Sequence, residues 1–205
     1  MTSTSRTAAL TISALGLAAA VTLAPPANVI YGAVAGGPPD TLVATPAAST
    51  IGWTGTGFGE RGAREGTVAL ASGMFVIRHE RLTSGTFTID MRSADAALRG
   101  ADFLDVERHP TAVFRSTESR RIGAARWQVR GDLTMRGVTR PITFDADVSW
   151  PGMGHMVATS AFTLDRRQWG LTARGAARAD DVANEGIRIS LTLDARRKQA
   201  KVATR

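Results

Sequence analysis

The feature that most constrains the fold of this chain is a strict alternation of apolar and polar residues. In the run RWQVRGDLTM, Trp127, Val129 and Leu133 share one parity, and the residues between them are polar or glycine. The same period of two recurs in four other runs, at 86–91, 142–150, 156–165 and 186–194. Such a run places its apolar side chains on one face of a β-strand. Strands with one buried apolar face and one solvent-exposed polar face are typical of an antiparallel sheet.

Short turn signals separate these runs, and nothing in the sequence predicts a long amphipathic helix that covers their apolar faces. Gly85 precedes one run, and MRGVTRP and WPGMGH join others at hairpin distances. Sheets of this kind must pack face to face or close on themselves. Closure also removes exposed strand edges, which invite aggregation. We therefore predict an all-β fold, an antiparallel β-barrel of about eight strands, with a β-sandwich as the alternative.

The stretch LRGADFLDVERHPTAVF is the one helical interruption that we predict among the strands. Within residues 94–105, Asp95 and Arg99 stand four apart, as a helix-supporting pair does, and the side chains of Leu98, Phe103 and Leu104 would point the same way. Pro110 disfavours helix in the residue before it, so that an extended strand begins at that point. We interpret the segment as a lid that plugs one end of the barrel, without a catalytic role.

The N-terminus has the pattern of an export signal. Arg6 precedes an uncharged, alanine-rich stretch that is short for a membrane span. The small residues at 33 and 35 are those that a signal peptidase reads, which predicts a signal peptide at 1–35, cleaved before Gly36. An uncleaved N-terminal anchor is the alternative; after cleavage we expect no stable insertion in a membrane. The expected location is the periplasm or the exterior of the cell.

The rest of the chain divides by composition. Residues 36–48 contain three prolines and resemble a flexible lead-in, while 49–196 hold the alternating runs and form the predicted barrel domain. Residues 197–205 form a basic tail, which we expect to be disordered.

Composition excludes several classes of function. The chain has no cysteine, so disulfides, thiol nucleophiles and thiolate metal sites are ruled out. Its net charge of +7 comes almost entirely from arginines that are scattered among acidic residues. A barrel that binds single-stranded nucleic acid needs aromatic and basic residues on one face, whereas parity puts them on opposite faces here. We therefore expect no nucleic-acid partner.

No pattern of residues indicates catalysis. The three histidines, at 79, 109 and 155, are isolated, and no two have the spacing of metal ligands. No Gly-x-Ser-x-Gly elbow presents a serine nucleophile. We predict a protein that is not an enzyme, without a catalytic residue, metal or cofactor.

Two blocks carry a resemblance to a known family. LRGADFLDVERHPTAVFRST is followed at the right spacing by VRGDLTMRGVTRPITFDADV, and together these resemble the YceI-like family of lipid- and polyisoprenoid-binding proteins. The resemblance extends from about Ser49 to Ala195. It implies an extended lipocalin-like barrel, exported from the cytoplasm, that holds a polyisoprenoid or fatty acyl lipid for transport, storage or stress protection. It leaves room for a homodimer.

The inward-facing apolar residues are the expected lining of the ligand site. The alternative is a structural or stress-protective barrel whose core these residues fill, with no ligand. The predicted lining consists of Trp53, Phe75, Phe87, Ile89, Phe103, Phe114, Trp127, Val129, Ile142, Phe144, Val148 and Phe162.

Overall fold

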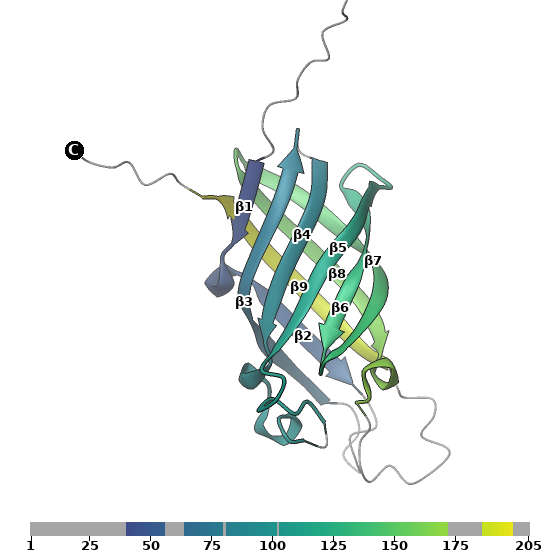
Figure 1. The fold of residues 1–205 in the computed structure, drawn as a ribbon. Helices are drawn as coiled ribbons and strands as arrows, with labels where there is room; N and C mark the ends of the chain where they lie inside the picture. The colour runs from purple at the N-terminus through teal and green to yellow at the C-terminus, as the bar shows by residue number, and fades with distance from the viewer. Residues whose placement is uncertain (1–39, 56–63, 80, 102, 172–185, 199–205) are drawn as a thin grey trace, which may run out of the picture. The chain divides into compact units, whose positions relative to one another are not determined.

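A computed structural model describes residues 40–55, 64–79, 81–101, 103–171 and 186–198 of the chain. In these residues nine antiparallel strands wind into a closed barrel (Figure 1). The predicted signal peptide and the end of the predicted tail lie outside the described residues. The strands are β1 (Asp40–Ala44), β2 (Thr50–Gly55), β3 (Arg64–Arg78), β4 (Arg81–Asp90), β5 (Thr111–Arg121), β6 (Arg126–Met135), β7 (Val138–Gly152), β8 (His155–Asp165) and β9 (Gly186–Arg197).

The nine strands occupy eight positions in the barrel wall, because β1 and β2 share one. β1 pairs with the second half of β3 and the end of β9, while β2 pairs with the first half of β3 and the start of β9. Between them the 3-10 turn η1 (Pro46–Ala48) interrupts the ladder, since Pro46 has no N–H to donate. β4 pairs with β3 and closes the barrel. The prediction of about eight strands in a barrel is confirmed.

The start of the barrel differs from the prediction. Residues 40–48, predicted to belong to a flexible lead-in, form β1 and η1. Leu42 is fully buried, and Thr45 N–H donates to the Asp194 carbonyl at 2.7 Å. The prolines of this segment disfavour an α-helix, but they are compatible with a short strand that ends before Pro46. At the other end, β9 extends to Arg197, which was predicted to be the first residue of the disordered tail.

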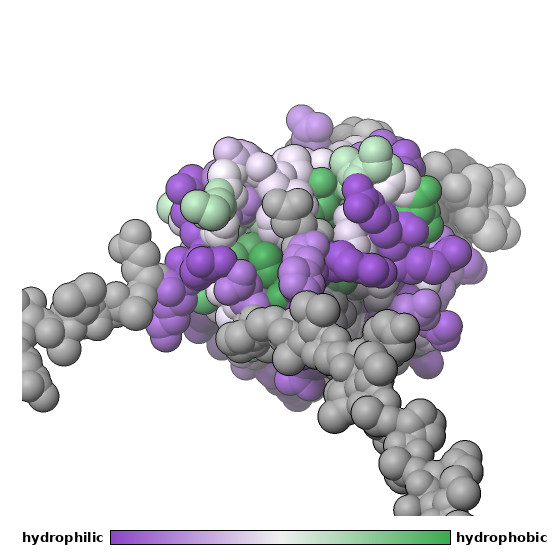
Figure 2. Space-filling model, turned by 90° about the horizontal axis from the view of Figure 1, so that it is seen from above, coloured by the Kyte–Doolittle hydropathy of each residue, from purple (hydrophilic) through white to green (hydrophobic). Residues whose placement is uncertain are grey.

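The alternation of the sequence appears directly in the burial of the strands. On β6, Trp127, Val129 and Leu133 are buried, while Arg130 and Asp132 are exposed. The same inward and outward alternation holds along β7 and β9. Seen along the barrel from the end opposite the lid, the surface is mostly hydrophilic, with small separate hydrophobic patches (Figure 2). No helix in the described ranges is long and apolar enough to cross a membrane.

The lid forms at one end of the barrel as predicted, built of short turns. We call residues 91–110 the lid; they contain the 3-10 turns η2 (Met91–Ser93) and η3 (Ala96–Leu98). Leu98 is 7% exposed, Phe103 9% and Leu104 6%, so all three pack inward. A further turn, η4 (Arg166–Trp169), was not predicted and lies at the same end of the barrel (Figure 1).

Arg136 joins these two end segments. It lies with Gly137 in the two-residue turn between β6 and β7, and both residues have positive φ, 52° and 74°, as a type I′ hairpin requires. Its guanidinium donates to the Gly170 carbonyl at 2.6 Å and to the Ala101 carbonyl at 2.8 Å. The lid and the segment after β8 are therefore fastened to one hairpin.

Candidate functional site

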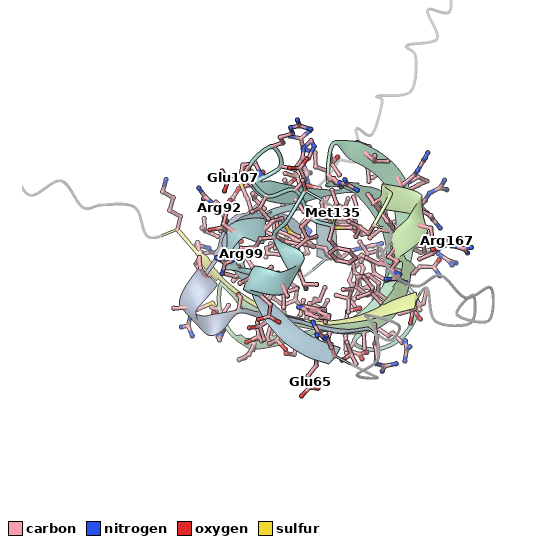
Figure 3. The ribbon with its side chains drawn as sticks, turned by 90° about the horizontal axis from the view of Figure 1, so that it is seen from below. Glu65, Arg92, Arg99, Glu107, Met135 and Arg167 are labelled. Carbon is pink, nitrogen blue, oxygen red and sulfur yellow. The ribbon has the colours of Figure 1, made fainter. Side chains whose placement is uncertain are left out.

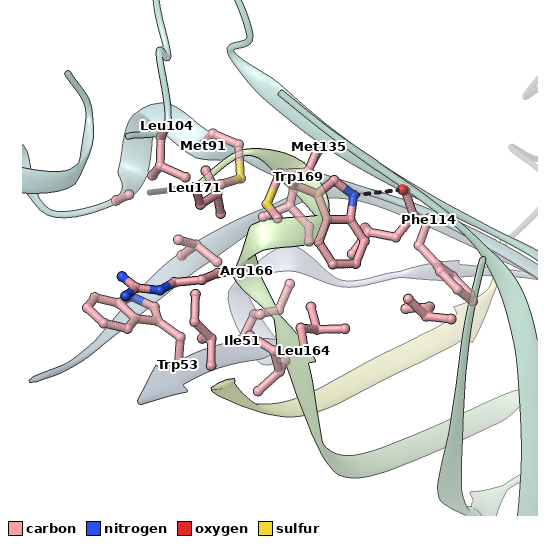
Figure 4. Close-up of a pocket in the computed structure, with 18 of the residues that line it drawn as sticks. Ile51, Trp53, Met91, Leu104, Phe114, Met135, Leu164, Arg166, Trp169 and Leu171 are labelled. Atoms are coloured by element: carbon pink, nitrogen blue, oxygen red, sulfur yellow. Dashed lines mark hydrogen bonds between the residues drawn. The ribbon is translucent and has the colours of Figure 1, made fainter. Parts of the chain in front are cut away.

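The lid end of the barrel encloses a cavity that is almost wholly apolar. Its volume is about 110 Å³. Its lining comes from strands all around the barrel, from the lid and from the segment after β8 (Figure 4). Arg166 is the one charged residue among the described residues that line it. A cavity of this size is far larger than the few water-sized voids of a packed core, so the barrel interior is not completely filled.

Most of the predicted lining residues surround this cavity. Phe103 reaches the cavity from the lid. Met135, at the end of β6, turns toward the interior, while Arg92, Arg99 and Arg167 lie around the rim of the barrel (Figure 3). The predicted residues at the cavity are Trp53, Phe87, Ile89, Phe103, Phe114, Ile142, Phe144 and Phe162.

The other predicted residues lie toward the opposite end. Phe75, Val129 and Val148 line a second, smaller cavity of about 30 Å³. Trp127 is 2% exposed and packs in the core, outside the lining of both cavities. Parity identifies a residue as inward-facing but does not give its height along the barrel axis.

Four phenylalanine rings contact one another in a row across the barrel. The ring centroids of Phe87 and Phe114 are 5.0 Å apart, those of Phe114 and Phe144 5.4 Å, and those of Phe144 and Phe162 4.6 Å. Phe87, Phe114 and Phe144 line both cavities. We call these three residues the aromatic belt.

Sequence reasoning missed the residues that close the cavity beside the lid. Trp169 is 1% exposed, and its indole N–H donates to the Leu133 carbonyl at 3.2 Å. Leu171 is equally buried. Arg166 is 6% exposed and lines the cavity (Figure 4).

A repeated sequence pattern signals this second turn. TIDMRS ends β4, and TLDRRQ ends β8. In each the aspartate side chain accepts from the backbone N–H two residues on, Arg92 at 3.1 Å and Arg167 at 3.0 Å, which starts a 3-10 turn. The arginine side chain then bonds the same carboxylate, and this hydrogen bond holds the pKa values of Asp90 and Asp165 below the ordinary value. The pattern at β4 leads into the lid, so its recurrence indicates another end segment.

A histidine–aspartate pair at the other end of the barrel has a structural role. His155 Nε2 lies 2.6 Å from Asp194 Oδ2, and Arg196 contacts the other carboxylate oxygen at 3.3 Å. The hydrogen bond with His155 holds the pKa of the Asp194 carboxyl below its ordinary value, and the charges of His155 and Arg196 add to this. Ser49 Oγ bonds the Asp194 backbone N–H and the Thr45 carbonyl, not the imidazole. The three residues therefore do not form a nucleophilic triad.

This pair predicts a loss of stability in acid. Because the folded pKa of Asp194 is lowered, its carboxylate contributes stability above the unfolded value of about 3.9, and this is lost as pH falls through the folded pKa. We expect Asp194→Asn to be less stable than the wild type near neutrality, with the difference shrinking below about pH 4. Thermal unfolding across that range measures it. Asp132→Asn, at an exposed position on β6, is the control; a difference that does not depend on pH would contradict this explanation.

In the described part of the chain, no three histidine or carboxylate side chains gather where they could hold a metal ion. Among the described residues, the lining offers apolar contact and one guanidinium.

Comparison with known proteins identifies the family. The model of the YceI-like domain matches residues 42–195, three quarters of the chain. The chain belongs to the YceI-like family. The match begins at Leu42, inside β1, in agreement with a barrel that starts before Ser49.

Two curated relatives of this YceI-like protein are known by a family name. A UPF0312 protein of Pseudomonas putida strain GB-1 is 31% identical over 140 residues, which cover 60% of this chain and 73% of the relative. A UPF0312 protein of Pseudomonas putida strain KT2440 is 36% identical over 102 residues, which cover 46% of this chain and 53% of the relative. The chain thus spans about half the length of the latter relative.

Solved structures show the same fold. BcnA of Burkholderia cenocepacia superimposes with a TM-score of 0.58 at 18% identity, covering 74% of this chain and 98% of BcnA. A polyisoprenoid binding domain from Saccharophagus degradans, implicated in plant cell wall breakdown, gives a TM-score of 0.56 at 10% identity and covers 78% of this chain and all of that domain. At such identities the similarity shows a common barrel.

Proposed function

We propose that this YceI-like protein is an exported carrier that holds a single long apolar chain, polyisoprenoid or fatty acyl, inside its barrel. The observation that carries the proposal is the apolar cavity of about 110 Å³ beneath the lid. An apolar cavity of roughly 150 Å³ stays dry and binds benzene in another protein. The polyisoprenoid binding of the Saccharophagus domain, which shares the fold, supports this class of ligand.

The energetics favour a chain-like ligand. Each methylene that leaves water contributes about 0.8 kcal/mol, so a chain sums many small terms without a specific hydrogen bond. The cavity walls come from apolar side chains of many strands, which offer such a chain apolar contact. The proposal assigns binding to the cavity and no catalytic step.

Native mass spectrometry of the protein purified from its own host tests the proposal. We expect a copurifying adduct with the mass of an isoprenoid or fatty acyl compound, lost on denaturation. A protein without adduct whose melting temperature is unchanged by added palmitate, hexadecanol or farnesol would support a structural or stress-protective barrel without a ligand instead. Bound ligand stabilises the folded state by mass action, so the second measurement detects binding even when the adduct is lost on purification.

Export is part of the proposal, and it predicts the mature N-terminus. The uncharged stretch after Arg6 and the small residues at 33 and 35 support cleavage between Ala35 and Gly36. The intact mass of the protein from the host is expected to begin at Gly36, and fractionation to place it outside the cytoplasm. A full-length protein in the cytoplasm would refute export without touching the ligand proposal.

A further inference from the structure

Four buried residues mark the boundary between the two cavities inside the barrel. The aromatic belt, Phe87, Phe114 and Phe144, lines both the lid-end cavity of about 110 Å³ and the smaller cavity of about 30 Å³, and so does Leu191. They come from β4, β5, β7 and β9, strands spread around the barrel wall. Side chains that line both cavities lie where one ends and the other begins.

One glycine gives the aromatic belt its reach across the barrel. Gly131 is a buried, inward-facing residue of β6, the strand that lies between β5 and β7. A Cβ at this position would come within 2.5 Å of Cζ of Phe114. Because Gly131 has no side chain, the ring of Phe114 lies over β6, and its centroid comes within 5.4 Å of that of Phe144.

The rings of the aromatic belt support one another. The centroid of the Phe114 ring is 5.0 Å from that of Phe87 on one side and 5.4 Å from that of Phe144 on the other. Phe144 in turn stacks on Phe162 at 4.6 Å with an angle of 13° between the ring planes. Aromatic pairs at such distances contribute stability beyond the burial of their area. A ring that turned aside to let a ligand pass would lose these contacts.

We infer that the aromatic belt is an end stop that limits the length of the ligand's tail. This inference rests on the proposed function and adds a determinant of specificity to it. Each methylene that finds apolar space raises affinity by about fourfold. A methylene that reaches the belt must either displace a ring from its neighbours or remain outside the cavity, so the gain ends at that length.

A series of saturated fatty acids from octanoate to stearate tests the end stop in the wild type. Their head groups are identical, so differences in affinity report on the tail alone. We expect the affinity, measured by isothermal titration calorimetry, to rise with each added pair of carbons and then to level off at a defined length.

Matched substitutions on the two sides of the boundary locate the end stop. Phe114→Leu removes a belt ring and should move the plateau to longer tails. Phe75→Leu is the control: Phe75 is also buried, at 5% exposure, but of the two cavities it lines only the smaller one. Because the belt stays intact in this variant, its plateau should equal that of the wild type. Phe87→Leu serves as the belt variant if Phe114→Leu does not fold.

The double variant with Phe114→Leu and Phe75→Leu provides a further measurement. Once the belt is open, a tail can reach the space that Phe75→Leu frees, so the plateau should lie at a longer tail than in Phe114→Leu alone. Phe75→Leu is therefore expected to have no effect behind an intact belt and a clear effect behind an open one. A loss of stability alone would not produce this difference, because it would weaken the binding of all tail lengths alike.

Three outcomes would overturn the end stop. One is an affinity that rises steadily through the whole series in the wild type, a result that needs no variant. Another is an unmoved plateau in a belt variant that circular dichroism shows to be folded. The third is a Phe75→Leu substitution that moves the plateau while the belt is intact. If no fatty acid of any length binds, the proposed function itself fails, so the two failures are distinguishable.

Discussion

Replacing Trp169 with alanine is expected to lower the free energy of unfolding by about 3–5 kcal/mol. Trp169 is 1% exposed, and it holds the end of η4 against β6 through its bond to the Leu133 carbonyl at 3.2 Å. Alanine would leave a cavity the size of an indole and would remove this hydrogen bond. Chemical denaturation monitored by circular dichroism measures the loss.

The neighbouring residue supplies the control for this prediction. Gln168 is exposed on the same turn, and only its backbone carbonyl is used, by Arg140. Gln168→Ala should therefore change stability by less than about 0.5 kcal/mol. Trp169→Phe, which keeps most of the packing and loses the N–H, should fall between the two. If Trp169→Ala unfolds like the wild type, the segment after β8 does not contribute to the stability of the barrel.

Replacing Phe144 with aspartate is expected to abolish ligand binding. Phe144 lies centrally on the inner face of β7, 5.4 Å from Phe114 and 4.6 Å from Phe162 between ring centroids, and it lines both cavities. A carboxylate at this position draws water into the apolar space that holds the tail. Loss of the adduct in native mass spectrometry, together with loss of the ligand-dependent rise in melting temperature, measures the effect.

The opposite face of the sheet offers the matched control. Arg130 is exposed on β6, and Arg130→Glu should leave the adduct intact. Should Phe144→Asp fail to fold, Ile142→Asp places the same charge at a half-buried position of the same strand. A folded variant that retains the adduct would show that the ligand lies elsewhere.

The sequence by itself determined which side chains point into the barrel. A strand turns successive residues to opposite faces, so the positions of Phe87, Val129, Ile142 and Phe144 follow from parity without any tertiary contact. The lid could also be predicted, because Leu98 and Phe103 interrupt the alternation in a segment that ends at a proline. The lack of covering helices predicted a closed barrel, with a β-sandwich as the alternative.

Only the tertiary structure decided where along the barrel these residues meet. Registers such as Phe87 opposite Phe114 and Val129 opposite Phe144 depend on hairpin turns and bulges, which parity does not specify. These registers place Ile142 at the lid-end cavity and Val129 at the smaller cavity. They also bring the three rings of the aromatic belt together.

The same limit applies to β1, to Arg166 and to Trp169. β1 is short and proline-flanked, and it becomes a strand because β3 and β9 offer free ladder positions on either side. Arg166 and Trp169 lie outside the alternating runs, and their inward direction depends on the cap at Asp165 and the left-handed Gly170. Local periodicity fixes the faces of strands, but the site arises from contacts between residues distant in the chain.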